Sequence, residues 1–204
     1  MPNLDIPVVQ LSREIFYVDD FLSIAECRSI MDELEIAFWQ SSKIITYLPG
    51  SESHHQVLAP SRISETAHQE WFSADLNAML GSIEKRLELY FDIDNSKLEY
   101  WQATQYPMRG KFDYHLDAGF WEKDNAGERV HTILLYLDTP LKGGSTHFRA
   151  LDLEIKPKTG RMVNWKNLFE NGDCNYKMIH ASLPLLKGTK TTLVTWERQK
   201  KHRT

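Results

Sequence analysis

The stretch Phe112-Asp113-Tyr114-His115-Leu116-Asp117-Ala118-Gly119-Phe120 decides how the chain is interpreted, because it sets a histidine and a carboxylate two residues apart. Side chains alternate between the faces of a β-strand, so His115 and Asp117 point to the same side if this stretch is extended. An imidazole and a carboxylate on one strand are two of the three ligands of a 2-His-1-carboxylate metal site. The pair alone also fits a surface contact or a core histidine, so a third ligand has to come from elsewhere.

The composition predicts one globular domain. The chain has 204 residues, of which 42% are hydrophobic and 25% charged, and it can bury a core of its own. A formal net charge of -4 gives no general attraction to nucleic acid or to an anionic membrane. The basic run that starts at Arg198 is typical of a solvated tail. We therefore expect neither nucleic acid nor a membrane as a partner.

The cysteines and the N-terminus bear on location. Cys27 and Cys174 lie far apart and form no CxxC motif, which favours a reducing compartment over a disulfide-linked secreted domain. The first residues show no basic segment followed by an apolar one, and no apolar run is long enough to span a bilayer. The prediction is a cytoplasmic protein.

Two amphipathic helices are expected in the first half. Apolar residues at helical spacing predict one helix over Ile24–Trp39, with Ser23 as its N-cap and Glu26 completing a capping box. The same pattern predicts a second helix over Ser73–Phe91. Both are expected to pack on a sheet.

The segment between these helices, Ser41–Ser64, is interpreted as a long loop. Pro49-Gly50-Ser51 indicates a turn, and so long a loop in a small domain is more often functional than idle. We predict a substrate lid. Adjacent His54 and His55 are expected to be surface residues, since neighbours on a loop rarely converge on one ion.

After Asp94-Asn95-Ser96 the chain changes to short β-favouring runs separated by glycines. Helices followed by strands predict an α+β domain in which the helices back a largely antiparallel sheet system. Residues 1–97 are expected to form the helical support and lid, 98–197 the β core and 198–204 a basic tail.

A candidate for the third ligand lies in the last fifth of the chain. His180 is followed by a proline-containing turn over Leu183–Gly188, and Lys190 opens the next strand. If the two strands are neighbours, the Lys190 ammonium stands a short distance beyond a metal held by His180. That position suits the distal carboxylate of a chelating cosubstrate such as 2-oxoglutarate.

Further motifs extend this pattern from Val18 to Trp196. In order they are Phe21-Leu22, Glu26-Cys27, Ser61-Arg62, Ser64, Glu99, Gln102, Tyr106, Gly110, Phe112, His115-Leu116-Asp117, Arg129, Thr132, Leu135-Tyr136-Leu137, Gly143-Gly144-Ser145-Thr146, Phe148, Pro157, Gly160, His180, Pro184, Gly188, Lys190 and Trp196. With this order and spacing the sequence resembles the Fe(II)/2-oxoglutarate dioxygenases of the prolyl 4-hydroxylase family. The resemblance implies a double-stranded β-helix (jelly-roll) core with N-terminal helices packed on one sheet. It also implies Fe(II), 2-oxoglutarate and O2, with ascorbate as a reductant.

The resemblance also implies roles for individual residues. His115, Asp117 and His180 would bind Fe(II), and Lys190 would pair with the C5 carboxylate of 2-oxoglutarate. Three residues are expected to line the cosubstrate pocket: Tyr136, Tyr106 and Thr132. Strand parity agrees, because Thr132, Leu134 and Tyr136 share one face, Lys190 shares a face with Trp196, and His131 has the opposite parity.

Two positions depart from the family pattern. Gly143-Gly144-Ser145-Thr146 stands where the family usually has Gly-Gly-Glu-Thr, and Ser182 stands where it has glycine. We expect these departures to concern the substrate side more than the iron ligands.

The function expected from this resemblance is hydroxylation of an amino-acid side chain, above all a prolyl residue of a protein or peptide. Two alternatives stay open. One is a hydroxylase of a free amino acid or a small natural-product intermediate, which predicts a closed pocket with a spare cation. The other is a non-catalytic jelly-roll binding module, which predicts loss of a ligand or of the lysine.

Overall fold

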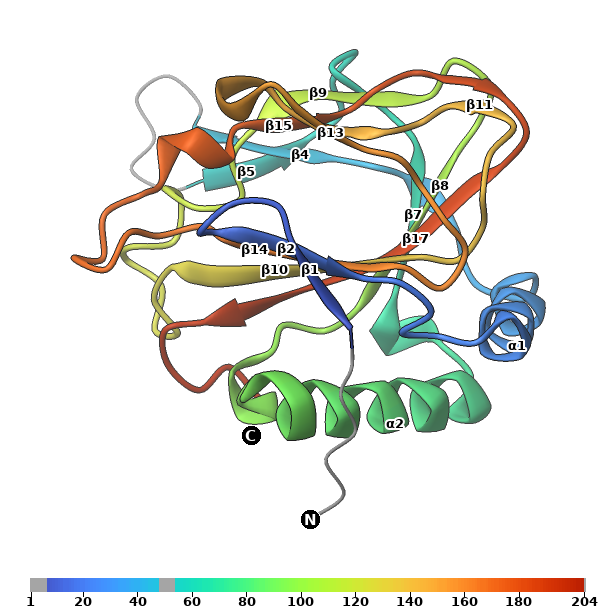
Figure 1. Cartoon of the computed structure of the whole chain (residues 1–204), viewed down its shortest axis with the longest axis horizontal. Coiled ribbons are helices and arrows are strands. Elements are labelled where there is room, and N and C mark those ends of the chain that lie inside the picture. The colour runs from blue at the N-terminus through green and yellow to red at the C-terminus, as the bar shows by residue number, and fades with distance from the viewer. Residues whose placement is uncertain (1–6, 48–53, 204) are drawn as a thin grey trace.

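The computed structural model of the chain describes residues 7–47 and 54–203, and Figure 1 shows two β-sheets, one above the other, with helices below them. Within these residues the larger sheet has the strand order β1-β2-β14-β10-β17-β8-β7-β3. Its strands are β1 (Val8–Gln10), β2 (Ile15–Val18), β14 (Met162–Lys166), β10 (Arg129–Tyr136), β17 (Lys190–Arg198), β8 (Gln102–Tyr106), β7 (Glu65–His68) and β3 (Gln40–Ser41).

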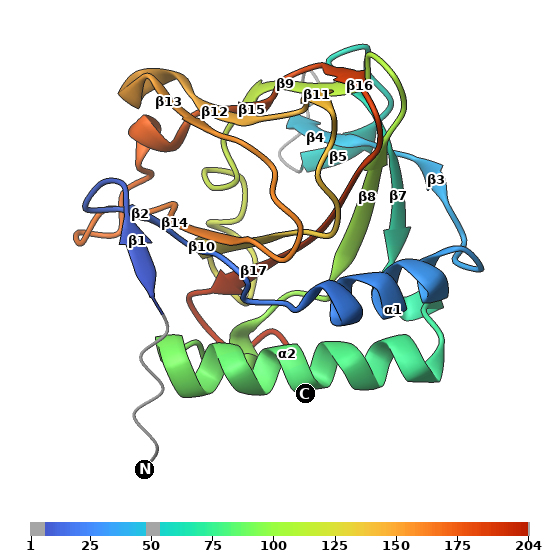
Figure 2. The ribbon, with the colours of Figure 1, turned by 45° about the vertical axis from the view of Figure 1, so that its right-hand side comes forward.

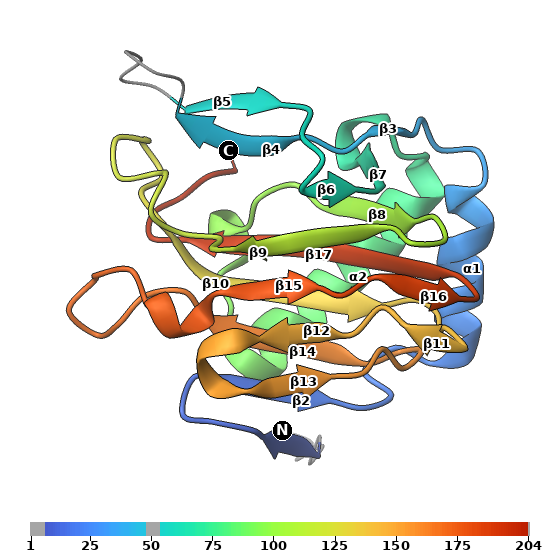
Figure 3. The ribbon, with the colours of Figure 1, turned by 90° about the horizontal axis from the view of Figure 1, so that it is seen from above.

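The smaller sheet has the order β13-β12-β15-β9-β6 and faces the larger one (Figure 3). Its strands are β13 (Leu153–Ile155), β12 (Thr146–Phe148), β15 (His180–Ser182), β9 (Lys111–His115) and β6 (Arg62–Ile63). Two ribbons complete the fold, β4 (Ile44–Tyr47) with β5 (His54–Val57) and β11 (Lys142–Gly143) with β16 (Leu185–Lys187). From β8 onward the chain passes back and forth between the sheets, so residues distant in sequence meet across the interior.

The helices lie against the outer face of the larger sheet (Figure 2). Helix α1 (Ile24–Leu34) has the predicted capping box between Ser23 and Glu26, but it ends five residues earlier than predicted. The Trp39 indole donates to the Leu34 carbonyl at 3.0 Å and helps to end the helix there, and Phe38 is left exposed. Helix α2 (Ala74–Phe91) agrees with the prediction within one residue. No helix of the described chain is long and apolar enough to cross a membrane.

Strand β10 shows how the sheet separates two environments. Ile133 and Leu135 are fully buried in the core shared with the helices, and burying each such side chain contributes roughly 1.5–3 kcal/mol. Thr132 and Tyr136, on the alternate face, are also buried, and Tyr136 belongs to a second core between the sheets. The predicted parity is confirmed, and Thr132 and Tyr136 face the space between the sheets.

The N-terminal half contributes more strand than expected. β1 and β2 extend one end of the larger sheet, while β3 and β7 extend the other. The predicted loop over Ser41–Ser64 includes the last residue of β3, the paired strands β4 and β5, and all of β6. Its predicted turn at Pro49-Gly50-Ser51 lies outside the described residues.

Two other expectations need correction. His180 and Lys190 do not lie on neighbouring strands, because β15 belongs to the smaller sheet and β17 to the larger one. The segment between them, including β16, carries the chain across from one sheet to the other. The C-terminal run is not simply solvated either, since Arg203 donates to Glu84 at 2.6 Å and stacks on Tyr100.

Candidate functional site

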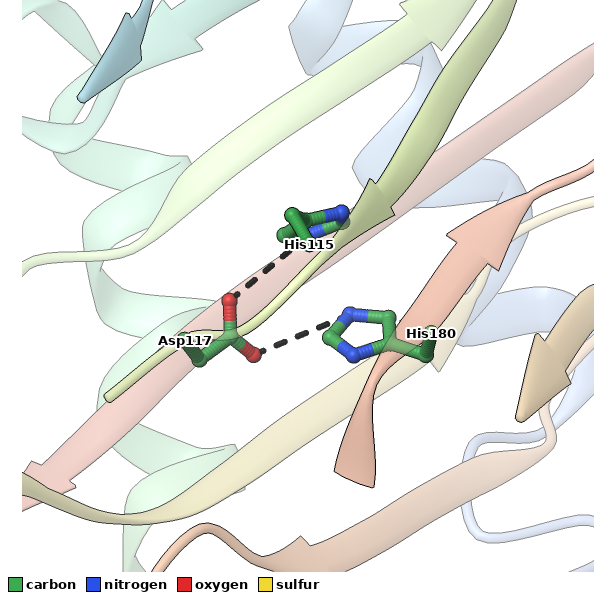
Figure 4. A group of neighbouring side chains, drawn as sticks. All are labelled: His115, Asp117 and His180. Carbon is green, nitrogen blue, oxygen red and sulfur yellow. Dashed lines mark ion pairs between the residues drawn. The ribbon is translucent and has the colours of Figure 1, made fainter. Parts of the chain in front are cut away.

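Three side chains from two neighbouring strands of the smaller sheet and a loop form a compact group between the sheets (Figure 4). His115 ends β9, Asp117 follows it in the loop, and His180 begins β15. His115 and His180 are directly paired across the antiparallel ladder, and the ligand atoms of all three residues lie within 4.8 Å of one another. The structure thus brings together the predicted metal ligands.

Both imidazoles are held in the orientation that a metal requires. His115 Nδ1 donates to the Asp113 carbonyl at 2.8 Å, and His180 Nδ1 donates to the Met178 carbonyl at 2.9 Å. A carbonyl can only accept, so each Nδ1 carries a proton, and in the neutral form of each ring Nε2 is then the nitrogen with the lone pair for a metal. These Nε2 atoms lie 3.8 and 3.9 Å from the Asp117 carboxylate.

The Asp117 carboxylate is held from the opposite sheet. Thr132 on β10 donates its hydroxyl to Asp117 Oδ2 at 2.7 Å, and Asn167 Nδ2 donates to the Thr132 hydroxyl at 2.8 Å. Such outer partners fix the orientation of a metal ligand. Sequence reasoning misses Asn167, because nothing near it in the chain indicates that it reaches this carboxylate through Thr132.

Burial and proximity set the charges of the group. Burial, followed by the neighbouring His180, lowers the pKa of His115, which keeps its imidazole neutral. Burial alone would raise the pKa of Asp117, but His180 and His115 more than offset it and hold that pKa below its usual value. A neutral His115 imidazole and an ionised Asp117 carboxylate are the forms in which these two groups bind a metal.

The donor set therefore fits a divalent ion. Two nitrogens and one oxygen converge from one side, and this combination is typical of non-haem Fe(II) sites with open coordination positions. Packed aromatic rings restrict the histidines, with Phe112 stacked on His115 at 3.6 Å between ring centroids and Trp165 lying 4.8 Å from His180.

A small inner cavity of about 80 Å³ extends from this group toward Lys190. Lys190 is only 2% exposed, and its ammonium donates to the Ser182 hydroxyl at 2.6 Å. It also lies 4.5 Å from the centre of the Tyr106 ring. Burial lowers the pKa of Lys190 to about 7, and within the described chain no carboxylate forms an ion pair with it. A buried ammonium with neutral partners suits an anionic ligand.

The remaining predicted pocket residues take different positions. Tyr106 and Thr132 line the inner cavity, as expected. The Tyr136 hydroxyl instead pairs with the Thr146 hydroxyl at 2.6 Å, and its ring centre lies 5.8 Å from the Lys190 nitrogen. Thr146 itself lines the cavity.

A larger outer cavity of about 370 Å³ meets the inner one at His115 and Asp117. Its walls come from β3, β4, β7 and the residues around the metal group, and they include Arg62, Trp121 and Trp196. The expected lid segment thus contributes to the wall of this cavity. Arg62 stacks on Phe112, with 4.6 Å between its guanidinium carbon and the ring centre.

Arg129 on the outer cavity belongs to an ion network. Its guanidinium makes two hydrogen bonds of 2.6 and 2.7 Å to Glu99, which also accepts from Arg198 at 2.9 Å. Trp196 lies against Arg129, with 3.6 Å from the guanidinium carbon to the ring centre.

Other histidines do not join the metal group. His131 points away, as its parity predicts, and pairs with Glu197 at 2.7 Å. His147 bonds to the Tyr114 hydroxyl at 2.6 Å. Among described residues, His115, Asp117 and His180 are the only such group, so His55 is not part of it, and the side chain of His54 lies outside the described part.

Comparison with known proteins agrees with this site. The family model of the 2OG-Fe(II) oxygenase superfamily matches residues 101–198. The chain is 28% identical over 200 residues to prolyl 4-hydroxylase subunit alpha-2 of Caenorhabditis elegans, covering 95% of this chain and 34% of that protein. It is 32% identical over 141 residues to prolyl 4-hydroxylase subunit alpha-1 of Bos taurus, covering 66% and 26%. The chain thus spans about a third or less of these relatives.

Solved structures show the same fold. The viral collagen prolyl hydroxylase of Paramecium Bursaria Chlorella virus-1, in its 2OG complex, superposes with a TM-score of 0.69 at 23% identity, covering 92% of this chain and 97% of that one. A Trichoplax adhaerens prolyl hydroxylase in complex with a hypoxia inducible factor peptide fragment gives a TM-score of 0.61 at 14% identity, covering 92% and 84%.

The fold and the metal group define the class of Fe(II)/2-oxoglutarate oxygenases. Within that class, the chain belongs to the prolyl 4-hydroxylase family.

Proposed function

We propose that this chain is an Fe(II)- and 2-oxoglutarate-dependent oxygenase that hydroxylates a prolyl residue of a protein or peptide. The observation that carries the proposal is one continuous site. A group of two histidines and one carboxylate borders a cavity lined by the buried Lys190 ammonium, which forms no ion pair with any carboxylate of the described residues. The back-and-forth path of the chain supports a double-stranded β-helix core. A binding module without catalysis is disfavoured because all three ligands and Lys190 are present.

The residues of the site have different roles in the proposed reaction. Fe(II), 2-oxoglutarate and O2, when bound, supply the oxidant that inserts oxygen into an unactivated C–H bond. His115, Asp117 and His180 would hold the metal, and Lys190 would hold the distal carboxylate of 2-oxoglutarate. Thr132 keeps Asp117 in place, and Trp121 and Trp196 help to enclose the outer cavity, where the target carbon would be oriented and water excluded.

The outer cavity supports a peptide substrate. Its volume of about 370 Å³ exceeds what one prolyl side chain fills, and its walls run from β3 to the last strand. The relatives named above are prolyl hydroxylases, which favours proline as the target residue. Ascorbate as reductant and a cytoplasmic location stay predictions from the sequence.

A small acidic substrate is the second candidate, because Arg62 offers a cation. Its guanidinium donates to the Lys43 carbonyl at 3.0 Å and to hydroxyls, and within the described residues no carboxylate forms an ion pair with it. Such a cation in the outer cavity would suit the carboxylate of a free amino acid.

The class is tested by stoichiometry. Purified chain with Fe(II) is expected to convert 2-oxoglutarate to succinate with matching O2 consumption, and His115→Ala or Asp117→Ala to abolish the conversion. Undiminished turnover in both variants would refute the metal site. Mass spectrometry of proline-containing peptides and free amino acids, looking for one added oxygen, then separates the two substrates. Arg62→Gln is expected to impair a small acid far more than a peptide.

A further inference from the structure

We propose that Ser182 is a third binding group, alongside Lys190 and Tyr106, for the distal carboxylate of 2-oxoglutarate. The inference rests on the proposed function and deepens it, because it concerns how this chain recognises its cosubstrate. It assigns a role to a position where the family pattern has glycine, which has no side chain to offer.

The position of Ser182 follows from the strand that carries His180. Residues two apart on β15 point to the same face, so Ser182 faces the interior like the metal ligand. Its register partners are Thr146 on β12 and Phe112 on β9. Ser182 is buried and lines the inner cavity together with Lys190. The hydroxyl therefore stands at the end of the cavity where a carboxylate is expected.

The contacts of Ser182 make it part of one polar cluster. Its hydroxyl accepts from the Lys190 ammonium at 2.6 Å, and a side-chain hydrogen bond links it with Tyr106. These three groups come from opposite sheets, since Ser182 lies on β15 while Lys190 and Tyr106 are paired residues on β17 and β8. The cluster thus fixes the ammonium from across the interior.

The hydrogen-bonding capacity of the cluster favours an anion. An ammonium carries three donors, and a serine or tyrosine hydroxyl adds one donor each. Among the described residues, the ammonium donates to a hydroxyl oxygen and forms no ion pair with a carboxylate. A carboxylate entering the cavity would accept from the ammonium and could accept from Ser182 as its hydroxyl rotates. Hydrogen bonds to a charged group are the stronger kind, worth roughly 1.5–3 kcal/mol each.

The test compares two ligands that differ only at the far end. 2-Oxobutanoate has the chelating head of 2-oxoglutarate but no distal carboxylate. Binding of each to the Mn(II)-loaded full chain is measured by calorimetry for the wild type, Ser182→Ala and the control Ser145→Ala. Ser145 is a buried serine next to β12 that is not part of the inner cavity wall.

We expect Ser182→Ala to weaken 2-oxoglutarate binding roughly tenfold, to leave 2-oxobutanoate within about twofold, and to raise KM for 2-oxoglutarate more than it lowers kcat. Ser145→Ala should leave both affinities unchanged. Equal weakening of both ligands would overturn the inference in favour of a purely structural role. Unchanged or tighter 2-oxoglutarate binding would also overturn it, since Ser182 would then only compete for the ammonium. A wild type that binds neither ligand would instead refute the proposed function.

Discussion

Two groups of buried cations lie on the same sheet, and they are partnered in opposite ways. Arg129 and Arg198 share the carboxylate of Glu99, although burial works to raise the pKa of Glu99 and the guanidiniums have to offset it. Lys190, equally buried, has a hydroxyl and an aromatic ring as its neighbours. A buried cation that forms an ion pair within the fold stabilises the folded chain. A buried cation whose partners are neutral is instead suited to binding an anionic ligand.

The largest expected effect is on stability, and it follows from removing the Glu99 carboxylate. Glu99→Gln removes the carboxylate that pairs with the buried Arg129 guanidinium and leaves Arg198 with only Asp124, so we expect it to lower the free energy of unfolding by roughly 3–5 kcal/mol. Urea denaturation followed by circular dichroism measures this loss. The exposed Glu154→Gln on β13 is the matched control and should change stability by less than about 0.5 kcal/mol. A loss in Glu99→Gln no larger than in the control would contradict the structural role.

The second prediction concerns a variant that lacks the Lys190 ammonium. Lys190→Met deletes a buried charge that forms no ion pair among the described residues, although Asp138 acts on it electrostatically, so stability should change by less than about 1 kcal/mol or increase. Binding of 2-oxoglutarate to the Mn(II)-loaded protein should instead weaken by roughly 10- to 150-fold, the value of a charge-assisted hydrogen bond. Calorimetry and urea denaturation measure the two effects, with the exposed Lys142→Met as control. If Lys190→Met destabilised the chain as much as Glu99→Gln, the two groups would not differ as described.

The smallest effect is a pH dependence. The pKa of Lys190 is about 7 in the folded chain, against 10.5 for a lysine that is free of burial, as in the unfolded chain. Between these values the unfolded state binds more protons, so the contribution of Lys190 to stability is least favourable below about pH 7 and improves as pH rises toward 10.5. The stability difference between wild type and Lys190→Met, measured by urea denaturation at several pH values, should therefore shift in favour of the wild type over this range. A flat or opposite trend would show that Lys190 keeps its ordinary affinity for protons.

Much of the site could be predicted from local patterns. The alternation of side chains places Thr132 and Tyr136 on one face of β10 and Lys190 with Trp196 on one face of β17, and both predictions hold in the structure. The capping box at Ser23 and the helix over α2 follow from spacing and residue type alone. Such features depend on backbone geometry over a few residues, which the sequence specifies directly.

Contacts between side chains that meet across the interior could not be predicted from local patterns. The sequence suggests neighbouring strands for His180 and Lys190, yet they reach the same cavity from opposite sheets. The Asn167–Thr132–Asp117 chain of hydrogen bonds and the Glu99 network likewise join residues that are far apart in sequence. No local sequence pattern predicts which side chains that are far apart in the sequence will be in contact.

The sequence by itself therefore determined the ligand types, the strand that carries His115, and the face to which Lys190 points, whereas Asp117 lies in the loop after that strand and not on it as expected. Only the tertiary structure decided that the ammonium would meet Ser182 rather than a carboxylate, and that Arg129 would be neutralised while Lys190 was not. The physical reason is that side-chain direction is set by the local backbone, whereas electrostatic partnership depends on the packing of two sheets against each other.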